Sequence, residues 1–120
     1  RLMVQVHADG GPASGRGFHT IVPAPSALGS TRLTSGPSKV LAAAMIAGMR
    51  SRGFVPATYL SSPLQVRTDQ GAMTVSTIPI VTVETLNMRN ASDAAVATSA
   101  TGRQRIAQGL YAGILRYLGH

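Results

Sequence analysis

Two ionisable side chains stand at the ends of the two most apolar segments of the sequence. His7 comes near the end of Leu2–Ala8, and Glu84, the only glutamate in the chain, ends Ile78–Glu84. A neutral imidazole can bind a metal ion, and a nearby carboxylate can act as a general base. This pair of residue types therefore indicates metal-assisted acid–base chemistry.

Both apolar segments are predicted to be buried strands. Leu2–Ala8 is rich in valine, and Ile78–Glu84 is nearly all apolar and β-branched, as in strands covered on both faces. Ligands bind outside the carboxyl ends of the strands in open parallel sheets. If the two strands are parallel neighbours, His7 and Glu84 lie at the same edge of the sheet.

Structural roles for these residues stay open on the sequence alone. A lone histidine at a strand end is often a hydrogen-bonded structural residue, and a lone glutamate after a strand is often a helix cap or an ion-pair partner. His19 lies inside a predicted strand and is interpreted as structural. The separation of His7 and Glu84 matches neither the HExxH pattern nor the paired-cysteine pattern of zinc sites.

The remaining segments alternate between strand and helix patterns. We predict a strand over Phe18–Val22, a loop over Pro23–Pro37, a helix over Ser38–Gly53, a short strand near Leu64–Arg67, a helix capped by Ser92 or Asp93 that runs to Ser99, and a last helix capped by Thr101 that ends at Gly119. This alternation predicts one α/β domain with a mostly parallel sheet flanked by helices.

The composition narrows the classes of partner. Eleven Lys and Arg residues against four Asp and Glu residues give a net charge of +7, which favours an anionic partner. The basic residues are spread along the chain and aromatic residues are only 4%, which argues against a nucleic-acid module. No apolar run approaches the roughly 20 residues of a membrane span.

The segments "QVHAD", "PIVTVE", "NMRN" and "TGRQRIAQGLYAGI" follow one another in an order that resembles a known family. The chain is similar to the zinc-dependent N-acetylmuramoyl-L-alanine amidases of the amidase-3 family, in their compact mycobacterial and actinobacterial form. The resemblance covers nearly the whole chain. It implies a single α/β catalytic domain that hydrolyses the amide bond between N-acetylmuramic acid and L-alanine in peptidoglycan.

The resemblance also implies roles for individual residues. The family holds one zinc ion with two histidines and one glutamate, and a second glutamate serves the chemistry. His7 matches the later zinc histidine and Glu84 matches the catalytic glutamate. The other two zinc ligands of the family lie upstream of the segment that matches His7, so we expect residues 1–120 to be the C-terminal part of a longer catalytic domain.

Substrate contacts are expected near the same edge of the sheet. Asp9, Gly10 and Gly11 directly follow the predicted metal ligand, and Arg67 precedes the second apolar strand. Alternatives remain for each, because the glycine-rich loop can be a plain turn and Arg67 can pair with Asp69. The expected protein is a monomer that acts on peptidoglycan in the cell envelope or outside the cell.

Three other functions stay open. Thr82, Thr85 and Leu86 depart from the family pattern around Glu84, so the protein can be a catalytically impaired homologue that binds peptidoglycan or regulates cell-wall metabolism. A carboxypeptidase-like zinc exopeptidase on a related scaffold is a second alternative. A nucleic-acid-binding module is a distant third.

Overall fold

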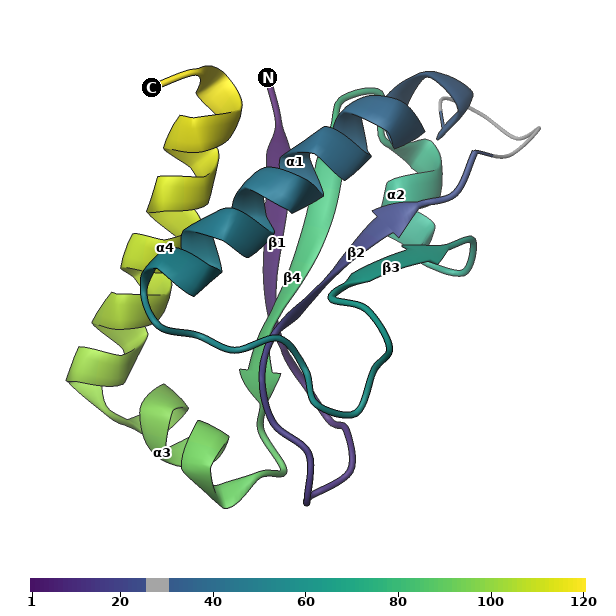
Figure 1. The fold of residues 1–120 in the computed structure, drawn as a ribbon. Helices are drawn as coiled ribbons and strands as arrows, with labels where there is room; N and C mark the ends of the chain where they lie inside the picture. The colour runs from purple at the N-terminus through teal and green to yellow at the C-terminus, as the bar shows by residue number, and fades with distance from the viewer. Residues whose placement is uncertain (26–30) are drawn as a thin grey trace.

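The computed structural model describes residues 1–25 and 31–120 of the chain, which form four strands and four helices (Figure 1). In chain order these are β1 (Met3–Asp9), β2 (His19–Pro23), α1 (Thr31–Ser51), β3 (Leu64–Arg67), α2 (Gly71–Val75), β4 (Ile80–Asn87), α3 (Ala91–Thr98) and α4 (Ala100–Leu118). This architecture confirms the predicted α/β class. Among the described residues, no helix has the length and apolar character needed to cross a membrane.

The strands form one sheet in the order β1-β4-β2-β3. β1 pairs with β4 in parallel and β2 pairs with β3 in parallel, whereas β2 and β4 run antiparallel. The sheet is therefore mixed, with parallel pairing between two of its three neighbouring pairs. Because β2 and β4 run antiparallel, the start of β2 lies beside the second half of β4. This pairing places His19 next to Glu84.

The two faces of the sheet have different partners. Helix α1 lies across one face (Figure 1), where Val81 and Val83 of β4 pack against Leu41 and Met45 of α1. On β4, side chains alternate between faces, so Glu84 projects from the opposite face. There the short helix α2 contributes Met73 to a small cluster with Ile21 and Ile80.

Helix α1 begins at Thr31, so the prediction of a loop as far as Pro37 is wrong for residues 31–37, and Pro37 lies inside the helix. Small polar side chains recur on its buried face at helical spacing, namely Thr31, Thr34, Ser35 and Ser38. The Ser38 hydroxyl accepts a hydrogen bond from the Ile80 amide at 3.0 Å, which anchors this turn to β4. Burial of these four side chains stabilises the helix more than the Ser, Gly and Pro residues of this segment disfavour it. Residues 26–30 of the predicted loop lie outside the described residues.

The predicted caps of the two C-terminal helices are each displaced. Asn90 caps α3, because its side chain accepts hydrogen bonds from the Ser92 and Asp93 amides. Ser99 caps α4 by accepting from the Gly102 amide. Gly119 ends α4 in the left-handed conformation (φ +82°), as predicted. The capping residues thus precede the predicted ones, and Asp93 is left for another role described below.

Glycines allow α1 and α4 to cross at close range. A Cβ atom at Gly48 of α1 would lie 2.4 Å from the Gly109 carbonyl oxygen and 2.4 Å from the Gly113 nitrogen of α4. Such distances are far below van der Waals contact, so the backbones approach directly. This crossing holds α4 against the face of the domain that carries α1.

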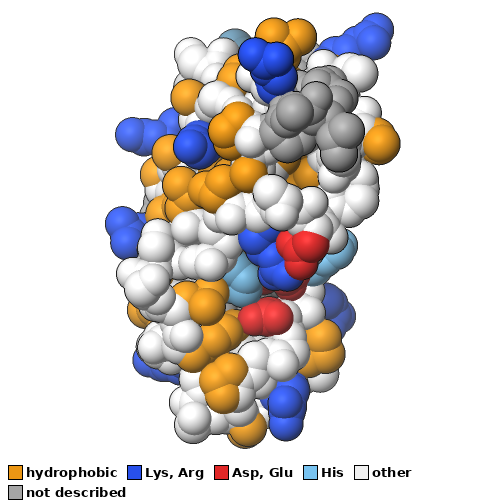
Figure 2. Space-filling model, turned by 90° about the vertical axis from the view of Figure 1, so that its right-hand side faces the viewer, with side chains coloured by type: hydrophobic (Ala, Val, Ile, Leu, Met, Phe, Trp, Pro, Cys, Tyr) orange, Lys and Arg blue, Asp and Glu red, His pale blue; other side chains and the backbone are white. Residues whose placement is uncertain are grey.

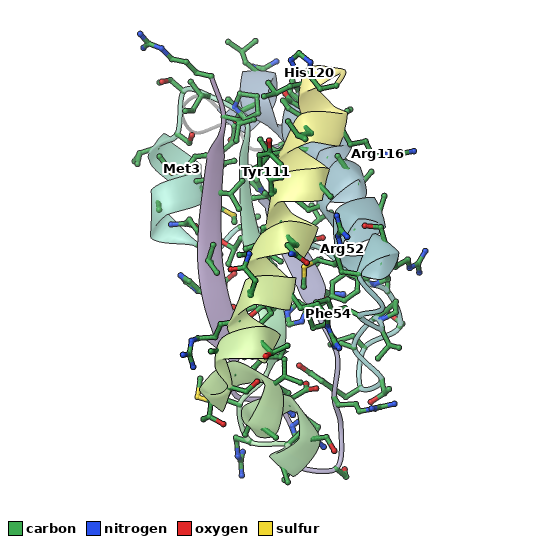
Figure 3. All side chains as sticks on the ribbon, turned by 90° about the vertical axis from the view of Figure 1, so that its left-hand side faces the viewer. Met3, Arg52, Phe54, Tyr111, Arg116 and His120 are labelled. Atoms are coloured by element: carbon green, nitrogen blue, oxygen red, sulfur yellow. The ribbon has the colours of Figure 1, made fainter. Side chains whose placement is uncertain are left out.

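Strand β1 is an edge strand in the described structure, and the prediction that it is buried is wrong. Met3 is 42% exposed and Val6 is 56% exposed, although Leu2 and Val4 lie partly buried against the main core. Figure 3 shows Met3 on this edge, beside α4 with its labelled Tyr111 and Arg116. A valine-rich composition predicted the strand correctly, but position in the sheet decides burial.

Candidate active site

His7 and Glu84 lie side by side, as predicted, although the predicted end of the strand at Glu84 is wrong, because β4 continues to Asn87. The two residues are register partners in the parallel pair β1–β4, and His7 Nδ1 is 3.6 Å from Glu84 Oε1. The His7 side chain is 52% exposed and the Glu84 side chain 12% exposed. The sheet therefore presents an accessible imidazole next to a carboxylate that is largely shielded from water.

Glu84 sits in surroundings that favour its protonated form. Its Oε2 atom is buried and has no hydrogen-bond partner among the described residues. Burial raises the pKa of Glu84, the negative charge of Asp9 raises it further, and the neighbouring His7 side chain opposes the shift. A carboxyl group with a raised pKa and a free oxygen is suited to take up and release a proton.

His19 completes a row of three side chains across the sheet. It is the register partner of Glu84 in the antiparallel pair β2–β4, so both side chains project from the same face. His19 is 5% exposed, and its Nδ1 atom is buried without a partner among the described residues. Burial lowers the pKa of His19, Asp9 opposes this shift and the positive charge of Arg67 adds to it, so the imidazole is neutral at pH 7.

The row is flanked by a residue that the sequence analysis did not single out. The Tyr59 hydroxyl donates a hydrogen bond of 2.6 Å to Asp9 Oδ2, and the Tyr59 ring meets the His19 ring edge to face with centroids 6.3 Å apart. Burial and the bond to Asp9 raise the pKa of Tyr59, which keeps the phenol protonated. Tyr59 lies in an irregular segment with no local signal, so only the fold identifies it.

The glycine-rich loop after β1 is packed under Tyr59. A Cβ atom at Gly11 or Gly15 would come within 2.7 or 2.5 Å of the Tyr59 ring. The fully buried Asn87 ties the loop down by donating from its side chain to the carbonyl oxygens of Pro12 and Gly15. These glycines therefore give room to a side chain of the protein itself, whereas a Cβ at Gly10 would meet only Arg89, at 4.0 Å.

Asp93 fixes the other end of this loop. One of its carboxylate oxygens accepts hydrogen bonds from the Gly17 amide at 2.9 Å and from the Asn87 amide at 2.8 Å. The contact joins the start of α3 to the loop between β1 and β2. Asp93, one of the two residues predicted to cap α3, thus joins the segments that surround the site.

Arg67 lies at the end of β3, where it forms a two-pronged ion pair with Asp69. The distances are 2.8 Å from Nε to Oδ1 and 2.6 Å from NH2 to Oδ2. The pair is solvent-exposed, and the charge of Arg67 opposes the raised pKa of Glu84. Figure 2 shows acidic, histidine and basic side chains gathered at the middle of one face of the molecule. The ion-pair alternative for Arg67 is thus observed, and a role in substrate binding stays a prediction.

The described residues supply at most part of a metal site. Within residues 1–25 and 31–120, no three His, Cys, Asp or Glu side chains are arranged to hold a metal ion. His7 fits the role of a single ligand, because it is exposed and its Nδ1 faces a carboxylate. That arrangement leaves Nε2 for a metal, as in many metal-binding histidines.

The fold and the site define an α/β domain with an imidazole–carboxylate pair at one end of a mixed sheet. The family model of N-acetylmuramoyl-L-alanine amidases (Amidase_3) matches residues 1–116, so the chain belongs to this family. The sequence is 38% identical to an N-acetylmuramoyl-L-alanine amidase of Mycobacterium tuberculosis over 97% of this chain and 47% of that protein.

Solved structures of such amidases have the same fold. The crystal structure of Ami1 from Mycobacterium smegmatis superposes with a TM-score of 0.89 at 38% identity, over 98% of this chain and 54% of that one. The apo form of Ami1 from Mycobacterium abscessus gives a TM-score of 0.88 at 37% identity, with the same coverage. The chain therefore spans about half the length of the relatives that it matches.

Proposed function

We propose that the full-length protein hydrolyses the amide bond between the lactyl group of N-acetylmuramic acid and L-alanine of the stem peptide in peptidoglycan. One observation carries the proposal. In a chain of the amidase family, an exposed imidazole lies 3.6 Å from a shielded carboxylate whose second oxygen has no partner among the described residues. This is the pairing of groups that hydrolysis with general-base assistance requires.

We infer that the intact enzyme binds one zinc ion, with His7 as one ligand and two further ligands from residues that precede Arg1 in the longer protein. Such an ion would supply Lewis-acid activation of the scissile carbonyl group and of the attacking water. The half-exposed His7 side chain fits such a shared site. The neighbouring Glu84 carboxylate faces Nδ1 of the imidazole and leaves Nε2 for the metal.

Glu84 carries the proton in this mechanism. Its carboxylate takes a proton from the attacking water, and its carboxylic acid then gives that proton to the leaving nitrogen of L-alanine. The raised pKa favours the second step, because a protonated Glu84 persists closer to neutral pH than an exposed glutamic acid. Shielding from bulk water keeps the proton between Glu84 and the substrate.

We also propose that four further residues position the substrate. Asp9, Gly10 and Gly11 begin the loop beside His7. Arg67 pairs with Pro23, at the end of β2 away from His19, and its charge acts on both His19 and Glu84. The net charge of +7 favours a cell wall that carries anionic polymers. Such a substrate places the protein in the cell envelope or outside the cell, and we propose that it acts there as a monomer.

Two of the three departures from the family pattern, Thr82 and Thr85, have hydrogen-bond partners on β1. The Thr82 hydroxyl bonds Gln5 Oε1 at 2.8 Å, and the Thr85 hydroxyl donates to the His7 carbonyl oxygen at 2.9 Å. Both bonds join β4 to β1 beside the site. They stabilise the pairing of the strands that carry His7 and Glu84, and the catalytically impaired alternative is left to the experiment below.

The test uses full-length protein and purified peptidoglycan, with products identified by mass spectrometry and zinc measured by elemental analysis. We expect wild type to hold one zinc per chain and to release intact stem peptides. Glu84→Gln should lower turnover by at least about 10³-fold while keeping the metal, and His7→Ala should lose both. Lys39→Gln, on the exposed side of α1, is the control for loss of one charge and should match wild type.

Three results would contradict the proposal. Equal release of stem peptide by wild type and Glu84→Gln would remove the catalytic assignment of Glu84. Zinc-loaded wild type that binds peptidoglycan without cleaving it would identify the impaired homologue. Products shortened by one amino acid would identify a zinc exopeptidase.

A further inference from the structure

His19 is the buried titratable group that the mechanism above does not use. It lies beside Glu84 in register, and both residues present a buried polar atom without a partner among the described residues, His19 Nδ1 and Glu84 Oε2. Buried polar atoms in folded proteins are nearly always hydrogen-bonded, so two unpartnered atoms on one face of neighbouring strands indicate a place for a ligand group.

The three side chains of the row, His7, Glu84 and His19, differ in their exposure to solvent. Side-chain exposure falls from 52% at His7 to 12% at Glu84, and His19 is 5% exposed. The row runs from the accessible His7 through Glu84 to the buried His19, so His19 is the innermost of the three side chains. The part of a bound substrate that lies farthest from His7 is therefore placed between Glu84 and His19.

We propose that His19 Nδ1 accepts a hydrogen bond from the scissile amide N–H of the substrate and so turns the leaving nitrogen toward Glu84. This assignment rests on the proposed amidase function. A neutral imidazole protonated on Nε2 has a lone pair on Nδ1, which matches an N–H donor. Burial and the nearby Arg67 keep His19 neutral, so the lone pair is available at pH 7.

The proposed hydrogen bond between the substrate N–H and His19 Nδ1 assists the step in which the C–N bond breaks. Water adds its oxygen to the carbonyl carbon and gives a proton to Glu84. The C–N bond then breaks, its electron pair goes to nitrogen, and Glu84 returns the proton there, which yields a carboxylic acid and the amine of L-alanine. Nitrogen must point its lone pair at Glu84 in that step, and a bond from its N–H to His19 sets this orientation.

The surroundings of His19 hold its ring in one orientation. Tyr59 contacts it edge to face and is itself bonded to Asp9. His19 also follows Phe18, which is fully buried in the main core. A side chain that is held this firmly can orient a substrate group with little loss of conformational freedom.

The experiment compares an amide substrate with an ester analogue that has no N–H at the scissile position. Full-length wild type, His19→Leu and His19→Asn are assayed on a muramoyl peptide and on the matching depsipeptide, in which oxygen replaces the L-alanine nitrogen. We expect His19→Leu to lower kcat on the amide about tenfold with KM unchanged, and to leave kcat on the ester within about twofold. His19→Asn keeps an acceptor oxygen near the same place and should recover most of the amide rate.

Controls separate this proposal from the amidase function. His120→Leu changes an exposed histidine that follows α4 and should match wild type on both substrates. Equal losses on amide and ester, or an unchanged amide rate, would overturn the role of His19 while an inactive Glu84→Gln leaves the amidase function standing. Wild type that cleaves no muramoyl peptide would overturn both.

Discussion

At the scale of single residues, the site depends on which neighbours each charged group has. Four acidic side chains serve a chain of 120 residues, and three of them lie in or beside the site. Asp9 bonds Tyr59, Glu84 faces His7, and Asp93 holds the loop that follows β1. The scarce negative charge is thus concentrated where it supports the site.

Removal of the Tyr59 hydroxyl tests how much its hydrogen bond to the Asp9 carboxylate contributes to stability. Tyr59→Phe removes the only donor in the 2.6 Å bond to Asp9 Oδ2, while the ring still covers Gly11 and Gly15. We expect the free energy of unfolding to fall by about 1.5–3 kcal/mol, the usual range for a hydrogen bond to a charged group. Urea denaturation measures it.

Tyr111→Phe is the matched control for this change. Tyr111 lies on α4 with 62% of its surface exposed (Figure 3), so removal of its hydroxyl should change stability by less than about 0.5 kcal/mol. If both variants unfold at the same urea concentration, the bond between Tyr59 and Asp9 contributes nothing to the fold.

At the scale of elements, the helix pair α1–α4 is held by close backbone contact. Gly48→Ala would place a methyl group 2.4 Å from backbone atoms of Gly109 and Gly113. Backbone atoms cannot move aside as a flexible side chain can, so we expect a loss of about 1–3 kcal/mol in the free energy of unfolding. Thermal or urea unfolding followed by circular dichroism gives this value.

The same helix offers a control of opposite sign. A methyl group at Gly36 would meet no atom within 4 Å, and Gly36 also lies inside α1. Gly36→Ala should therefore stabilise the protein by up to about 1 kcal/mol, because alanine restricts the unfolded chain and favours helix. Destabilisation by both substitutions to a similar extent would show that helix packing is not the cause.

At the scale of the whole molecule, it is the total positive charge that attracts anionic partners, and not one cluster of residues. The basic residues lie on many elements, and a net charge of +7 attracts anionic polymers without a dedicated patch. We expect binding of full-length protein to walls that carry anionic polymers to weaken at least tenfold when salt rises from about 0.05 to 0.5 M. Co-sedimentation with purified walls measures the bound fraction.

Walls stripped of their anionic polymers provide the comparison. Binding to the stripped walls should depend much less on salt, since only contacts at the site remain. If both wall preparations show the same salt dependence, the net charge does not direct the protein to the wall.

Much of the fold was predictable because it follows from local patterns. The β-branched run at Ile80–Val83 and the helical stripe from Leu41 to Met49 produce the elements that they predict. Errors occurred where distant contacts override local composition. Residues 31–37 are helical because their small polar face is buried, and within the described residues β1 has a sheet neighbour on one side only.

His7 and Glu84 could be singled out from the sequence because each stands near the end of an apolar segment, although β4 continues beyond Glu84 to Asn87. Their contact, the place of His19 opposite Glu84, and the position of Tyr59 over the glycine loop were decided only by the tertiary structure. The physical reason is strand register. A shift of one residue in either pairing of β4 would turn these side chains to opposite faces of the sheet, and that register is set by packing between segments far apart in the chain.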